Sequence, residues 1–181
     1  MRFVLMAAIA LCAASVVAPA EAAACNLSAS KLWPATKGRP LVTEAYSNGR
    51  NCALAVVVIV VRGTDGKPIW HDAMPAEHVM TFVEAKTPKQ MKAALGDWLY
   101  QSHTFKSTGD LPEWKKGAEA PTVVGEFPFY PEADVDQETY SKIRTGKAPI
   151  FCYVQGMESL SCVALAKDGG MTKVGVQTFP G

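Results

Sequence analysis

The chain has 181 residues, of which 49% are hydrophobic and 19% are charged. These values are ordinary for a single folded domain and argue against disorder over the whole chain. Eighteen Lys and Arg residues oppose 17 Asp and Glu residues, which gives a formal net charge of +1. Nucleic-acid and anionic-membrane binders carry a basic excess that this chain lacks, so we expect neither partner.

The first 24 residues have the pattern of a secretory signal peptide. Arg2 supplies the positive charge, residues 3–17 form an apolar stretch, and small residues between Ala20 and Ala24 offer cleavage sites. No later apolar stretch is long enough to span a bilayer. We therefore predict a signal peptide at 1–24 and one periplasmic or secreted domain at 25–181. The alternative is a lipoprotein signal, in which Cys25 would carry a lipid anchor.

Four cysteines remain after the signal peptide, which is typical of disulfide bonding in an oxidising compartment. If 149–155 and 160–166 form an antiparallel hairpin, Cys152 and Cys162 lie opposite each other, close enough to be bonded. Cys25 is then left to bond Cys52. The spacing does not match a redox or zinc motif, so we interpret both pairs as structural.

An apolar run, Cys52–Val61, predicts the central strand of the fold. Six of its ten residues are β-branched, and turn residues flank it on both sides. We expect strands at Leu41–Ser47 before it and Lys67–Asp72 after it, which together make a three-stranded meander. Asn26–Gly38 has an irregular pattern. A run that is apolar at every position also predicts cover on both faces of its sheet.

The clearest helix signal begins at Thr87. Thr87 and Gln90 have the spacing of a capping box, and Pro88 suits the first helical position. One apolar stripe then follows at helical spacing, formed by Met91, Ala94, Leu95, Trp98 and Leu99. This stripe should cover one face of the central strand.

The second half begins with a long loop, 101–131, that is rich in Gly, Pro and charged residues. Long loops are often functional, so its aromatic residues are candidate binding residues for a partner: Trp114, Phe127, Phe129 and Tyr130. The alternative interpretation is that these rings attach the loop to the core.

A second helix should follow, capped by Asp134, with 135–143 as its apolar part and Gly146 at its end. Either this helix or the aromatic loop should cover the second face of the central strand. Three strands then form a second meander, at 149–155, 160–166 and 171–179, and the last of them is a candidate exposed edge. The prediction is a single α+β domain with a mostly antiparallel sheet in two meanders, about two packed helices and two disulfides.

No motif of a common enzyme class is present, which weighs against catalysis. We predict a non-catalytic binding protein, whose partner is another envelope or extracellular protein or an envelope ligand; an enzyme inhibitor falls within this class. The alternative is a copper- or zinc-handling protein, because imidazole and thioether ligands suit such metals. Its ligands would be His71, Met74, His78 and Met80. A general base at His71 or His78, oriented by Asp72 or Glu77, is a further possibility that lacks a partner nucleophile.

Overall fold

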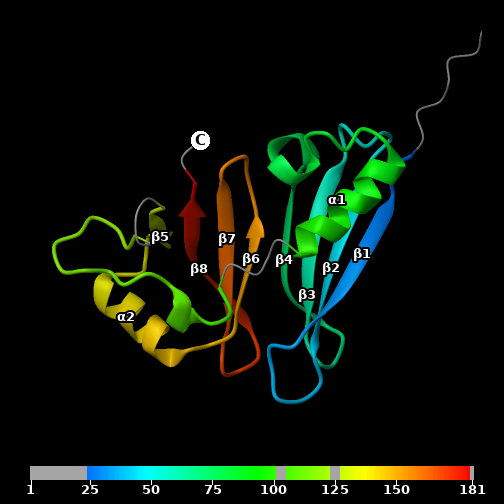
Figure 1. The fold of residues 1–181 in the computed structure, drawn as a ribbon. Coiled ribbons are helices and arrows are strands. Elements are labelled where there is room, and N and C mark those ends of the chain that lie inside the picture. The colour runs from blue at the N-terminus through cyan, green and yellow to red at the C-terminus, as the bar shows by residue number, and fades with distance from the viewer. Residues whose placement is uncertain (1–23, 101–104, 123–126, 180–181) are drawn as a thin grey trace, which may run out of the picture.

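Two four-stranded antiparallel sheets lie side by side in the computed structural model, which describes residues 24–100, 105–122 and 127–179 (Figure 1). The first sheet has the order β1 (Leu27–Trp33), β2 (Leu41–Asn48), β3 (Val56–Arg62) and β4 (Pro68–Pro75). The second has the order β5 (Phe129–Pro131), β8 (Met171–Thr178), β7 (Ser159–Leu165) and β6 (Ile150–Val154). The helices are α1 (Pro88–Tyr100) and α2 (Gln137–Gly146), and short 3-10 turns are η1 (Ala76–His78), η2 (Met80–Phe82) and η3 (Thr108–Asp110). The predicted α+β domain, with two helices and two disulfides, is confirmed.

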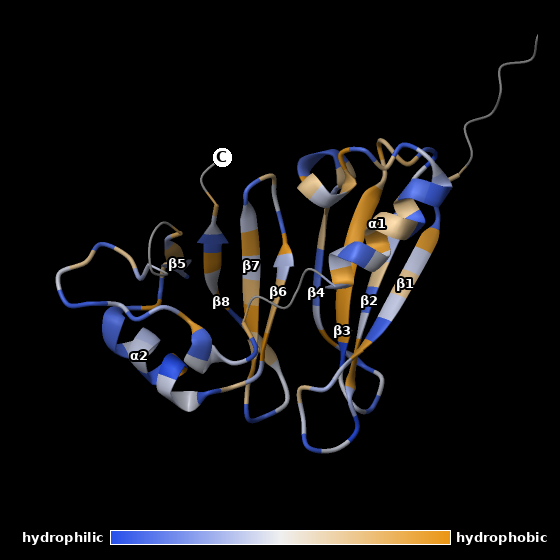
Figure 2. Cartoon of the chain, viewed as in Figure 1, coloured by the Kyte–Doolittle hydropathy of each residue, from blue (hydrophilic) through white to orange (hydrophobic). Residues whose placement is uncertain are grey.

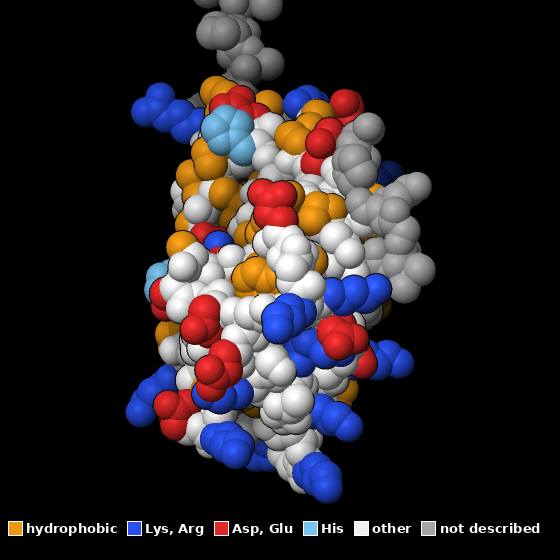
Figure 3. All heavy atoms as spheres, turned by 90° about the vertical axis from the view of Figure 1, so that its left-hand side faces the viewer, with side chains coloured by type: hydrophobic (Ala, Val, Ile, Leu, Met, Phe, Trp, Pro, Cys, Tyr) orange, Lys and Arg blue, Asp and Glu red, His pale blue; other side chains and the backbone are white. Residues whose placement is uncertain are grey.

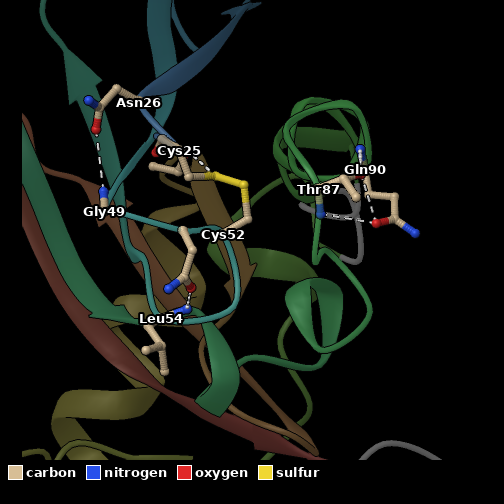
Figure 4. The surroundings of a disulfide bond; sticks show 9 residues. Cys25, Asn26, Gly49, Cys52, Leu54, Thr87 and Gln90 are labelled. Carbon is tan, nitrogen blue, oxygen red and sulfur yellow. Dashed lines mark hydrogen bonds between the residues drawn. A yellow bond between two sulfur atoms is a disulfide. The ribbon is translucent and has the colours of Figure 1, made fainter. Parts of the chain in front are cut away.

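Helix α1 follows its sequence signal closely. The backbone N–H of Thr87 donates to Gln90 Oε1 (3.1 Å), and the N–H of Gln90 donates to Thr87 Oγ1 (3.3 Å), which completes the predicted capping box (Figure 4). Every residue of the predicted apolar stripe is buried. The helix covers β1 and β2, and its stripe belongs to the same hydrophobic core as the buried side chains of β3 (Figure 1).

Two predictions about the first sheet are wrong. The 26–38 segment contains strand β1, whose side chains alternate between half-buried and exposed. The central strand begins at Val56, because Cys52 lies in a turn from which it reaches Cys25. The sheet is therefore a four-stranded meander, although β3 keeps the predicted interior place and is mostly hydrophobic along its length (Figure 2).

The second face of β3 does not have the cover that the sequence predicted. Val57, Ile59 and Val61 are fully buried, whereas the exposed fraction on the opposite face ranges from 43% at Val56 to 9% at Val60. Neither of the two predicted covers lies there, because α2 and the aromatic residues of the 105–131 segment pack in the second half of the molecule (Figure 1). Long side chains of the same face, such as Tyr46 and Arg62, give partial cover instead.

Both disulfides form as predicted. Cys152 and Cys162 are directly opposite in the β6–β7 ladder, as the hairpin register required. Cys25 joins Cys52 and ties the start of β1 to the turn before β3 (Figure 4). The Cys25 sulfur is used in this bond, so the structure favours the disulfide over the lipid-anchored alternative. The predicted signal peptide lies outside the described residues, except for Ala24.

Polar contacts join the two sheets between the neighbouring strands β4 and β6. The hydroxyl of Tyr153 donates to Asp72 Oδ2 (2.8 Å) and accepts from Trp70 Nε1 (3.3 Å). The indole of Trp98, on α1, donates to the backbone oxygen of Val154 (2.7 Å). Burial raises the pKa of Tyr153 far above its ordinary value, so this hydroxyl remains a proton donor. These contacts fix one half of the molecule against the other.

In the second half, α2 is capped by Asp136 rather than by the predicted Asp134. The carboxylate of Asp136 accepts from the backbone N–H of Thr139 (2.8 Å), and this hydrogen bond lowers its pKa. The prediction that the last strand is an edge is also wrong, because β8 lies between β5 and β7.

Candidate functional site

A groove of about 880 Å³ lies between α2 and the second sheet. Its volume falls within the range of about 300–1,000 Å³ that small-molecule sites occupy. The walls come from α2, from the ends of β7 and β8, and from the segment before β2. Their apolar side chains include Val135, Ile143, Ala148, Pro149, Ala164 and Val174. This groove is the candidate functional site.

The groove exists because α2 is attached to the η3 segment instead of being packed directly on β7 and β8. Tyr140 is fully buried, and its hydroxyl donates to the backbone oxygen of Pro112 (2.9 Å). Arg144 Nε donates to the backbone oxygen of Leu111 (2.8 Å), and Thr108 Oγ1 donates to that of Ile143 (2.7 Å). These bonds hold the helix from one side, so the other side of α2 is left to form a wall of the groove.

Small or apolar side chains line both walls of the groove. Helix α2 contributes Thr139, Ile143 and Gly146, which are three and four residues apart and therefore share one face of the helix. The opposite wall carries Ala164 and Val174 from the second sheet. The ring of Tyr140 points to a different place, where it contacts Trp114 and Phe129. The helix thus has one anchoring face and one face that lines the groove.

Charge is unevenly distributed around the groove. Four lysines line it against one carboxylate, Asp134. Lys142 pairs with Glu138 (2.6 Å) and Lys173 pairs with Glu132 (3.1 Å), whereas Lys147 and Lys167 have no ion pair among the described residues. Figure 3 shows this side of the molecule, where basic side chains gather over the lower half with acidic ones among them. An apolar wall beside unpaired cations suits a ligand that has both an apolar body and a negative charge.

The predicted aromatic binding residues do not form one surface. Phe129 is fully buried against Tyr140 and Phe105, and Trp114 packs on Tyr140 with its indole donating to the backbone oxygen of Ala118 (2.9 Å). Phe127 pairs with Phe179, and only Tyr130 is largely exposed, at 50%. Most of these rings therefore attach the segment to the core. Their role in partner binding stays a prediction, and residues 101–104 and 123–126 of the same loop lie outside the described residues.

The predicted metal ligands are spread along β4 and beyond its end. His71 and Met74 are three positions apart on β4 and so belong to opposite faces, while His78 and Met80 lie in the turns that follow. Among the described residues, no three His, Cys, Asp or Glu side chains are grouped closely enough to hold a metal ion. Metal handling stays a prediction.

The suggested general base also lacks its orienting groups. Asp72 accepts a hydrogen bond from Tyr153, on the face of β4 opposite His71. Glu77 lies 3.9 Å from Nε2 of His78, and both side chains are well exposed. Neither arrangement has the close, buried geometry that a catalytic pair uses.

A second polar cluster lies on the open face of the first sheet. Glu44 accepts from the hydroxyl of Tyr46 (2.5 Å) and from Nε of Arg62 (2.7 Å). Burial raises the pKa of Glu44, but the hydrogen bonds from Tyr46 and Arg62 outweigh burial and hold that pKa below its ordinary value. Because these groups satisfy one another, we interpret the cluster as a structural cross-strand contact.

Comparison with protein-family models, with curated proteins and with solved structures finds no match for this chain. The groove residues were not among the sequence predictions, because Ile143 and Ala164 are brought together only by tertiary packing. One signal was present in the sequence: 146–149 and 164–167 each hold a single lysine among uncharged, mostly small residues.

Proposed function

We propose that the protein is an exported, non-catalytic binding protein that holds a small amphipathic molecule in the groove between α2 and the second sheet. The groove carries this proposal, since it combines a ligand-sized volume with apolar walls and lysines. A ligand's apolar body would lie along Ile143, Ala164 and Val174 and be removed from water there.

Export is supported by the signal-peptide pattern and by the two disulfides, which are consistent with an oxidising compartment. None of the described helices is long and apolar enough to cross a membrane. A binding role fits the scattered positions of His71, His78 and their acidic neighbours better than a catalytic one. Binding of a protein partner, expected from the aromatic loop, is not needed for this proposal.

The test uses N-phenyl-1-naphthylamine, a neutral apolar dye that fluoresces strongly when removed from water. We expect saturable binding to the purified protein. Thr139 is exposed on α2 and lines the groove, so Thr139→Trp should fill it and abolish binding. Thr145→Trp is the matched control, because Thr145 is an exposed threonine of the same helix and is not part of the groove lining. Dye binding that is absent from wild type, or equal in both variants, contradicts the proposal.

A further inference from the structure

Lys147 has an unusual backbone conformation at the edge of the groove. It directly follows α2 and has φ 49° and ψ 36°, which is the left-handed region. A helix commonly ends with one such residue, but the residue is usually Gly and sometimes Asn, because a side chain is strained there. Among the described residues, Lys147 is the only one other than Gly with positive φ. The preceding residue is Gly146, so a glycine lies one position away from the place where it would relieve this strain.

The surroundings accommodate the lysine side chain. A Cβ added to Gly109 would lie 3.1 Å from Lys147 Cγ, so the stem of the lysine passes close over a position that has no side chain. The flanking backbone is also fixed: the N–H of Lys147 donates to the oxygen of Arg144 (3.2 Å), and the N–H of Ala148 donates to Thr108 Oγ1 (3.0 Å). The base of this side chain is therefore held in one place beside the groove.

The charge of Lys147 has no partner among the described residues. Lys147 is exposed, lines the groove and makes no ion pair with a described residue, whereas Lys142 and Lys173 are each paired with a glutamate. Strained residues that a fold retains are concentrated at active sites and ligand-binding positions. A strained, unpaired cation at an apolar groove is explained if its charge is used by a ligand.

We propose that Lys147 binds the negatively charged group of the groove's ligand, and that this ligand is an amphipathic anion, an alkyl or acyl chain with one terminal carboxylate or phosphate. This inference rests on the proposed function, because it assigns the charged end of the molecule whose apolar body lies in the groove. Lys167 also lies on the groove wall and makes no ion pair with a described residue, and it adds to the same positive potential.

The experiment measures displacement of bound N-phenyl-1-naphthylamine by four decyl compounds at concentrations below micelle formation. Decanoate and decyl phosphate carry the two anionic groups, 1-decanol is neutral and decyltrimethylammonium is cationic. We expect the two anions to bind more tightly than the other two, with an advantage that decreases as salt is added. The tighter of the two anions identifies the headgroup. Equal binding of decyltrimethylammonium and the anions overturns the inference.

Three substitutions separate the charge of Lys147 from its strain. Lys147→Gly removes both, and it should weaken binding of the anions about fivefold while raising the Tm by about 2–4 °C. Lys147→Ala removes the charge and keeps the strain, so it should weaken binding without the gain in Tm. Lys147→Arg keeps both properties and should bind as wild type does. Lys89→Ala, on the exposed side of α1, controls for the general loss of a positive charge.

Different results would contradict the role of Lys147 and the proposed function of the groove. If Lys147→Gly and Lys147→Ala bind decanoate and decyl phosphate as tightly as wild type while the dye still binds, the role of Lys147 is wrong and the groove remains the site. If wild type binds neither the dye nor any decyl compound, the proposed function fails and this inference fails with it.

Discussion

Removing the two disulfides should cost unequal amounts of stability. Cys25 and Cys52 are 27 residues apart, whereas Cys152 and Cys162 are 10 apart. A cross-link restricts the unfolded chain more when its loop is longer, and the loop-entropy relation gives about 3.6 kcal/mol for the first bond and about 2.7 kcal/mol for the second. All four cysteines are buried, so replacement by Ala costs similar side-chain burial at each pair. The expected difference is about 0.9 kcal/mol.

Equilibrium urea unfolding of the two double-Ala variants measures this difference. The Cys25→Ala, Cys52→Ala variant should have the lower extrapolated free energy of unfolding. The Cys152→Ala, Cys162→Ala variant should lose less, because strands β6 and β7 remain paired by their own hydrogen bonds. An equal loss, or a larger loss from the shorter loop, would refute the reasoning that loop length dominates.

Three further predictions concern packing and charge. A side chain at Gly175 would collide with the backbone oxygen of Tyr130, so Gly175→Ala should lower the urea midpoint, and an unchanged midpoint contradicts the β5–β8 register. Tyr153→Phe removes the hydrogen bond to Asp72 and should cost about 2 kcal/mol, whereas Tyr130→Phe, at an exposed position, should cost nothing measurable. Backbone N–H groups lower the pKa of Asp110, so its contribution is present at neutral pH and lost as the pH falls through that lowered pKa. The free energy of unfolding of Asp110→Asn should therefore be lower than that of wild type at neutral pH and approach it in acid. A difference that persists in acid contradicts a stabilising role for the ionised Asp110 carboxylate.

Local signals in the sequence predicted the elements that local interactions determine. The capping box and the apolar stripe of α1 act within one helix, so the role of Thr87 as helix cap and the buried positions of α1 were predictable. The Cys152–Cys162 bond was predictable for a similar reason, because a short hairpin fixes which residues lie opposite each other.

Features that depend on distant partners were missed. Strand β1 has only Leu27, Ala29, Lys31 and Trp33 on its half-buried face, which is a weak strand pattern without knowledge that β2 pairs with it. The apolar run of β3 indicated two covered faces, but Val56 remains exposed because β-branched residues also suit an open sheet face.

The backbone conformation at the end of α2 also depends on residues that are distant in sequence. Helix α2 ends at Gly146 as predicted, but the left-handed conformation that Gly usually takes at a helix end falls on the next residue, Lys147. The contact of Thr108 with the backbone of Ile143 and Ala148 fixes the chain there, and Thr108 is 35 residues or more away in sequence. The groove itself arises from these same contacts.

The central claim is that an amphipathic ligand binds in the groove between α2 and the second sheet. Its most direct test is to map ligand binding by NMR. Decanoate is titrated into the isotope-labelled protein, and backbone amide shifts are followed residue by residue. Binding in the groove predicts the largest shift changes at Ile143, Lys147, Ala164 and Val174, with the β1–β4 sheet unaffected. Changes concentrated on the open face of the first sheet, or no saturable changes at all, would contradict the account.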